Sequence, residues 1–87
     1  MFVVLSYDIG EKRVAKVSRI VKKYLSAKQR SLYQGFLTQK QLSNLKRELL
    51  SCLNPAHDTV SIYKINDTHD LNIDEIGTTQ VQNHYII

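Results

Sequence analysis

The sequence predicts an α+β fold of the ferredoxin-like kind, in which two helices cover one face of an antiparallel sheet. Two segments repeat apolar residues at helical spacing, and short apolar or alternating runs lie before, between and after them. The resulting order is strand, helix, one or two strands, helix, strand and a terminal strand, which is the split βαβ pattern. With 87 residues and 43% hydrophobic composition, the chain is expected to form one small domain that gains stability from oligomerisation.

The first strand is expected at the apolar run of residues 2–5, which leads directly to Tyr7 and Asp8. A run this short and this rich in β-branched residues is typical of a strand in the middle of a sheet. The first helix is expected over residues 11–25, from an apolar stripe at helical spacing. That stripe consists of Val14, Val17, Val21 and Tyr24, and Ile20 widens it.

Residues 29–37 are expected to form one or two strands that a turn or bulge at Gly35 interrupts. The second helix begins with a capping box, in which Thr38 and Gln41 each satisfy a backbone N–H of the other. Asn54 and Pro55 end this helix. Its apolar stripe consists of Leu42, Leu45, Leu49 and Cys52 or Leu53.

A further strand is expected at residues 59–65, which alternate at a period of two. The polar and acidic stretch 66–82 is expected to be a loop, and residues 84–87 return to strand-like composition. Residues 1–65 would thus form the core of the domain, and residues 66–87 would supply an acidic connector and a C-terminal strand.

Charge is divided unevenly along the chain. Residues 1–47 hold eleven Lys or Arg and two acids, whereas residues 48–87 hold one Lys and six acids. A basic row at helical spacing lies on the first expected helix and comprises Lys12, Lys16, Arg19 and Lys23. Such a row indicates contact with nucleic acid, and the alternative is ordinary surface charge that is unevenly distributed.

Asp8 is the strongest candidate for a metal ligand. It stands at the rim of a rigid strand and faces a basic helix, which suits a divalent cation held against a phosphate. The pair Asp8 and Glu11 fits equally well with a helix N-cap. A single carboxylate binds Mg²⁺ poorly, and a two-fold dimer that brings two Asp8 side chains together would meet this objection.

Five other side chains have two interpretations each. Tyr7 either packs beside its strand or contacts phosphate or metal-bound water. Arg13 and Arg30 either bind phosphate or lie on a solvated face. Tyr33 and its neighbour Phe36 either stack on bases or belong to the core. The single cysteine and the shortness of the apolar runs favour a cytoplasmic protein without a membrane span.

Five short motifs follow one another along the chain: Tyr-Asp-Ile-Gly at 7–10, the end of the basic helix at 22–25, Gln-x-Ser-Leu-Tyr-x-Gly at 29–35, Asp-x-Val-x-Ile-Tyr at 58–63 and Glu-Ile-Gly at 75–77. No single one of them is specific, but their order in a chain of this length is. With this set of motifs the chain resembles the small CRISPR-associated endonucleases of the spacer-acquisition machinery.

The resemblance implies a homodimeric, metal-dependent nuclease that acts on RNA or duplex DNA and bridges the CRISPR integrase. Asp8 would bind Mg²⁺ or Mn²⁺ shared between two protomers. The C-terminal strand, with Tyr85, Ile86 and Ile87, would cross to the partner's sheet. Two other classes stay open: a nucleic-acid adaptor without catalysis, in which Asp8 is only a cap, and a ferredoxin-like regulatory domain that binds a small molecule.

Overall fold

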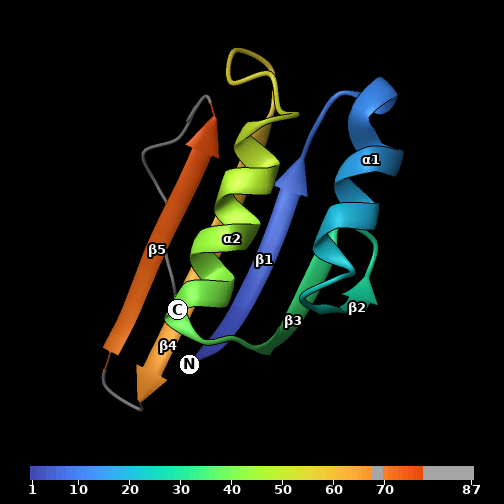
Figure 1. Ribbon diagram of the computed structural model, residues 1–87. Coiled ribbons are helices and arrows are strands. Elements are labelled where there is room, and N and C mark those ends of the chain that lie inside the picture. The colour runs from blue at the N-terminus through green and yellow to red at the C-terminus, as the bar shows by residue number, and fades with distance from the viewer. Residues whose placement is uncertain (68–69, 78–87) are drawn as a thin grey trace.

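The computed structural model describes residues 1–67 and 70–77, which form a five-stranded sheet and two helices (Figure 1). The elements in chain order are β1 (Phe2–Asp8), α1 (Glu11–Val21), β2 (Ser26–Gln29), β3 (Leu32–Phe36), α2 (Gln39–Leu50), β4 (Thr59–Asp67) and β5 (Asp70–Gly77). The strands lie in the order β2-β3-β1-β4-β5, and all neighbours are antiparallel. The predicted ferredoxin-like α+β fold is confirmed.

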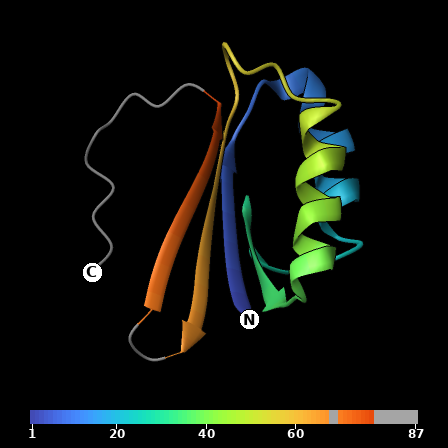
Figure 2. The same ribbon diagram turned by 60° about the vertical axis from the view of Figure 1, so that its left-hand side comes forward.

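The core lies between the sheet and the two helices, which cover the same face of the sheet (Figure 2). Alternate residues of the central strands point toward the helices. Val3 and Leu5 of β1 are fully buried there, as is Ile62, which lies opposite Leu5 on β4. The helices contribute Val17, Val21, Leu42, Leu45 and Leu49 to this core.

The opposite face of the sheet has no helix among the described residues. Val4 lies on this face, because it alternates with the buried Val3 and Leu5. Its neighbours across the sheet are Gln34 on β3 and Tyr63 on β4. An apolar residue at the centre of this face makes the face a candidate for contact with a partner.

The capping box predicted for the second helix is present. The backbone N–H of Gln41 donates to the Thr38 hydroxyl at 3.1 Å, and the Gln41 side chain accepts from the Thr38 N–H at 2.8 Å. The first helix ends at Val21, earlier than predicted, and a turn follows it. Neither described helix is long and apolar enough to cross a membrane.

Two predictions of irregular structure are wrong. The expected loop over 66–82 is strand at 66–67 and at 70–77, while 68–69 and 78–82 lie outside the described residues. Its mixed acidic composition suits an edge strand, which natural sheets protect with charge. Gly35 does not break its strand either, since it pairs with Val3 inside β3. The turn lies instead at Ser31, and a pairing irregularity lies in β2.

The core interpretation of the two aromatic residues holds for one of them. Tyr33 is buried, but Phe36 is 78% exposed and packs edge-on against Phe2, with ring centroids 5.1 Å apart. Since the two positions differ by three, they lie on opposite faces of β3. Val14, expected in the helix stripe, is also exposed, and it borders a groove described below.

Candidate metal and nucleic-acid site

Asp8 is the last residue of the central strand, at the point where the sheet loses one of its neighbours. β1 pairs with β3 only as far as Ser6, but it pairs with β4 as far as Asp8, which lies opposite Thr59. The Asp8 side chain is exposed, and none of the hydrogen bonds or ion pairs among the described residues engages its carboxylate. This carboxylate is therefore available to a ligand from solvent.

Asp8 does not cap α1, which was the alternative interpretation of its position. The N-cap residue is Gly10, and no side chain of the cap position bonds to the helix start. The Gly10 N–H donates instead to Oδ1 of Asp58, at 2.8 Å. Two different carboxylates thus have the two roles considered for Asp8. Asp58 accepts the hydrogen bond from the Gly10 N–H at the start of the helix, and the Asp8 carboxylate stays exposed to solvent.

Asp58 is a fully buried carboxylate at the start of β4. Besides Gly10, it accepts from the Asn54 N–H at 2.8 Å, and from Nε and Nη2 of Arg13 at 2.5 and 2.8 Å. The hydrogen bonds from the Arg13 guanidinium hold the pKa of Asp58 far below its usual value. Burial acts in the opposite direction, and the two backbone donors lower the pKa further. Asp58 is therefore ionised at neutral pH.

Arg13, proposed from sequence as a phosphate ligand, is engaged inside the protein. Nε and Nη2 both donate to Asp58, and 29% of the side chain is exposed. The helical spacing of basic residues cannot show that a buried carboxylate lies 45 residues further along the chain. We therefore place Arg13 outside the candidate nucleic-acid surface.

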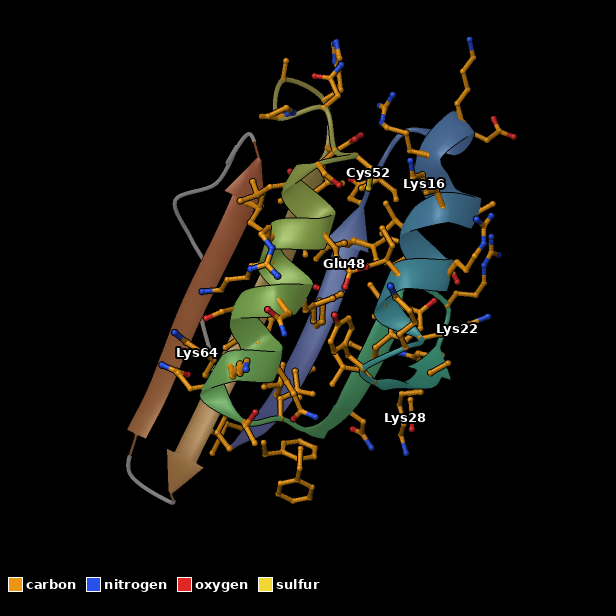
Figure 3. The ribbon with its side chains drawn as sticks, in the orientation of Figure 1. Lys16, Lys22, Lys28, Glu48, Cys52 and Lys64 are labelled. Carbon is orange, nitrogen blue, oxygen red and sulfur yellow. The ribbon has the colours of Figure 1, made fainter. Side chains whose placement is uncertain are left out.

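An open groove of about 590 Å³ lies beside Asp8, between α1 and the β2–β3 hairpin. Its lining consists of Tyr7, Asp8, Ile9, Val14, Lys22, Ala27, Gln29, Arg30, Ser31 and Tyr33. Lys22 and Arg30 are exposed, so the groove combines two cations with one carboxylate. Figure 3 shows Lys22 at the C-terminal end of α1, next to the hairpin.

Tyr7 packs inside the protein, as one of its two interpretations expects, and it also borders the groove. Its ring stacks on Tyr33 with centroids 5.8 Å apart, and the two hydroxyls lie 3.3 Å apart. The Tyr33 hydroxyl also bonds to Ser18 at 2.9 Å. Burial, together with the hydrogen bond to Tyr33, raises the pKa of Tyr7 to about 12. Tyr7 is therefore neutral at physiological pH and can donate a hydrogen bond.

The basic row of α1 divides into exposed and engaged members. Lys12, Lys16 and Arg19 are exposed. Lys23 pairs with Glu48 of α2, and Tyr24 donates to the other oxygen of the same carboxylate. Figure 3 shows Glu48 on the side of α2 that faces α1. The first three cations remain available to a phosphate backbone.

The described residues of one chain do not by themselves complete a metal site. Among residues 1–67 and 70–77, no three His, Cys, Asp or Glu side chains lie together as a ligand cluster. Mg²⁺ commonly takes only one or two carboxylates and completes its shell with water and substrate phosphates. The exposed Asp8 therefore fits as one ligand of a site that a second carboxylate or a phosphate completes.

Sequence reasoning missed Asp58 and Lys22 as residues of this region. Asp58 stands between the Asn54–Pro55 turn and a buried strand. An acid at such a place could have been considered as an acceptor for the start of a neighbouring helix. Lys22 lies between Arg19 and Lys23 of the predicted basic row without belonging to it, and its role depends on the position of the hairpin, which the local sequence does not show. Tyr85, Ile86 and Ile87, predicted to contact a partner, lie outside the described residues.

The fold and the site define a small ferredoxin-like α+β protein that presents a strand-end carboxylate beside a basic groove. Comparison with known families gives this class a name. The chain belongs to the family described as CRISPR associated protein Cas2, whose sequence profile matches residues 1–73. The resemblance found in the sequence is thereby confirmed.

Individual relatives agree with this assignment. The chain is 31% identical over 86 residues to a CRISPR-associated endoribonuclease Cas2 of Thermotoga maritima, and the match covers 99% of both chains. It is 31% identical over 87 residues to the protein of the same name in Methanosarcina acetivorans, with both chains fully covered. A crystal structure described as Cas2 superposes with a TM-score of 0.70 at 31% identity, covering 100% of this chain and 98% of the other.

Proposed function

We propose that this chain is a homodimeric, metal-dependent endonuclease that hydrolyses phosphodiester bonds in single-stranded RNA or duplex DNA and bridges the CRISPR integrase in the cytoplasm. The single observation that carries the nuclease proposal is the carboxylate of Asp8, presented to solvent beside a groove that Lys22 and Arg30 line. The names of the relatives, endoribonuclease and endonuclease, support the same chemistry.

Four residues of the groove have roles in this proposal. Asp8 and its counterpart in the second protomer would hold Mg²⁺ or Mn²⁺, which when bound would supply Lewis-acid polarisation of the phosphodiester and activation of water. Lys22 and Arg30 bind phosphates of the substrate strand, and Arg30 can do so with two parallel hydrogen bonds. The Tyr7 hydroxyl contacts substrate phosphate or metal-bound water at the edge of the groove.

The proposal is tested by cleavage with metal present and removed. We expect the purified protein to cut RNA or DNA with Mg²⁺ or Mn²⁺, to lose this activity with a chelator, and to regain it when metal is restored. Thermal unfolding is measured in parallel, and it should change little with the chelator. Cleavage that persists in excess chelator would contradict metal dependence.

The exposed cations of α1 give a prediction for binding. Reversing Lys16 and Arg19 to Glu should weaken binding to duplexes of any sequence, because contacts to phosphate carry no sequence information. The salt dependence should also flatten, by about 0.9 in the log–log slope for each lost contact. Fluorescence anisotropy at several salt concentrations measures both effects.

The matched control reverses Lys40 and Arg47 of α2 and changes the net charge by the same amount. Both residues are exposed. If the control flattens the salt dependence as much as the α1 variant does, the effect is one of net charge, and the assignment of α1 as the contact surface is wrong.

The uncovered face of the sheet supports the homodimer. Val4 is at its centre, and Phe2, Leu32 and Tyr63 belong to the same face by strand alternation. We expect Val4→Lys to convert a dimer into a monomer, because a lysine cannot be buried unpaired between two sheets. Sedimentation velocity measures the change. Ser43→Lys on the exposed side of α2 is the control, and dimerisation unaffected by Val4→Lys would contradict this interface.

A nucleic-acid adaptor without catalysis is the second candidate. The observation that favours it is the absence of a three-ligand cluster among the described residues, combined with the exposed basic row. The adaptor would bind duplex and integrase through shape and charge alone. It predicts binding without cleavage under every metal condition of the test above.

A further inference from the structure

We infer that Asp58 is a positioning residue for Asp8: held by Arg13, it fixes the turn that joins the end of β1 to α1. This inference deepens the proposed nuclease function and rests on it. Asp58 lies 50 residues from Asp8 in the sequence and does not border the groove. It would therefore act on the site through the backbone rather than by contact with substrate.

The first support is the set of donors that converge on Asp58. One is the Gly10 N–H, from the connection between β1 and α1. Another is the Arg13 guanidinium, from the first turn of α1, and the third is the Asn54 N–H of the loop before β4. A single buried carboxylate thus ties the residue two places after Asp8 to the loop that leads into the neighbouring strand. If Asp58 is lost, nothing else in the described structure bonds to the Gly10 N–H.

The second support is the close packing around this carboxylate. A side chain at Gly10 would meet the Arg13 guanidinium, and one at Gly77 would overlap the backbone carbonyl of Asp58. Gly77 also has a φ of +112°, which few other residues adopt. The turn after β1, at Gly10, and the end of β5, at Gly77, therefore both pack closely around the Asp58–Arg13 pair, which leaves the turn little room to shift.

The third support is a fixed point on the other side of Asp8. The Tyr7 N–H donates to the Ser31 carbonyl at 3.2 Å, and Ser31 has a φ of 54°, unusual for a residue other than glycine. The chain is thus held one residue before Asp8 by Ser31 and two residues after it by Asp58. Of the two acceptors that hold the chain here, the Ser31 carbonyl is neutral and the Asp58 carboxylate is charged.

Groups that orient metal ligands from a distance commonly change metal affinity or activity by about 10–100-fold when they are removed. Asp58→Asn keeps the shape of the side chain and one acceptor oxygen but loses the charge that holds Arg13. We expect it to weaken Mn²⁺ binding and to lower kcat by about tenfold or more, with a smaller change in KM for the nucleic acid.

The experiment compares Asp58→Asn with Glu48→Gln, which removes the charge from the ion pair at the other end of α1. Both proteins are assayed at a temperature where each is folded. Arg13→Lys is the alternative variant if Asp58→Asn does not fold. Three quantities are measured: hydrogen exchange at the amides of residues 8–10 without metal, Mn²⁺ affinity by calorimetry, and kcat and KM.

The inference is supported if exchange at residues 8–10 becomes about tenfold faster and Mn²⁺ binding weakens in Asp58→Asn, while Glu48→Gln changes neither. Unchanged exchange overturns it. Faster exchange with unchanged Mn²⁺ affinity and kcat also overturns it, since Asp58 would then be purely structural. If the wild-type protein cleaves nothing, the proposed function fails separately, and exchange and Mn²⁺ affinity still decide the role of Asp58.

Discussion

Replacing Asp8 with asparagine is expected to abolish metal-dependent cleavage and to leave the fold unchanged. The Asp8 carboxylate makes none of the hydrogen bonds or ion pairs of the described chain, so its removal should change the free energy of unfolding by less than about 0.5 kcal/mol. In the proposed dimer, the same change removes both negative charges that would hold the cation. Cleavage should therefore fall by about 10²–10³-fold or more, as when a group that stabilises transition-state charge is removed.

The matched control is Glu11→Gln, which removes an exposed carboxylate three residues away in the first turn of α1. It should cost a few tenths of a kcal/mol through the helix dipole and leave cleavage close to wild type. The assay is single-turnover cleavage with verified dimers of all three proteins. Full activity in a folded Asp8→Asn dimer would reject the catalytic assignment and favour the adaptor. If the proposed bridging of the integrase is right, spacer integration should survive the substitution, since a bridge depends on shape and positive charge.

Replacing Asp58 with alanine is expected to have the largest effect on stability of any single change considered. It leaves Arg13 without its partner and the N–H groups of Gly10 and Asn54 without an acceptor. Breaking a buried ion pair by removing one member costs about 3–5 kcal/mol, and the partial exposure of Arg13 favours the lower end. For a domain of this size, about 3 kcal/mol corresponds to a fall in Tm of about 12–24 °C.

Calorimetry at several pH values separates what the charge of Asp58 contributes to stability from what the shape of its side chain contributes. Because the pKa of Asp58 is lowered in the folded protein, its charge contributes stability that is complete above the unfolded pKa of about 3.9 and is lost as the pH falls through the folded value. The difference in unfolding free energy between wild type and Asp58→Asn should therefore be constant from about pH 8 to 5 and shrink below about pH 4. A difference that stays constant in acid would show that the charge contributes nothing.

The parts of the fold that could be predicted from sequence are those that depend on neighbours along the chain. The capping box at Thr38 and Gln41 is a contact over three residues, and the apolar stripes of both helices reflect a local period. The alternation of Val60 and Ile62 likewise identifies a buried strand face. Each of these patterns gave the correct element.

The remainder depends on contacts between distant segments. Asp8 and Glu11 satisfy the local rule for a helix cap, but the acceptor comes from Asp58 on another loop, so the local rule chose the wrong residue. Gly35 similarly reflects the close approach of Leu25, whose Cδ2 would lie 3.2 Å from a Cβ at that position. A glycine required by tertiary contact has the same appearance in sequence as one required by a turn.

The place of β1 in the sheet has a consequence for the order in which the protein becomes active during synthesis. β1 emerges first from the ribosome, yet Asp8 pairs with Thr59, and Arg13 has its acceptor in Asp58. Pairings this far apart along the chain form late, because a long loop must close first. In a nascent chain that ends before Asp58 and β4, Asp8 would lack its neighbouring strand and Arg13 would lack the Asp58 carboxylate. The candidate site therefore assembles only when most of the described chain has been made, so unfinished chains would lack it.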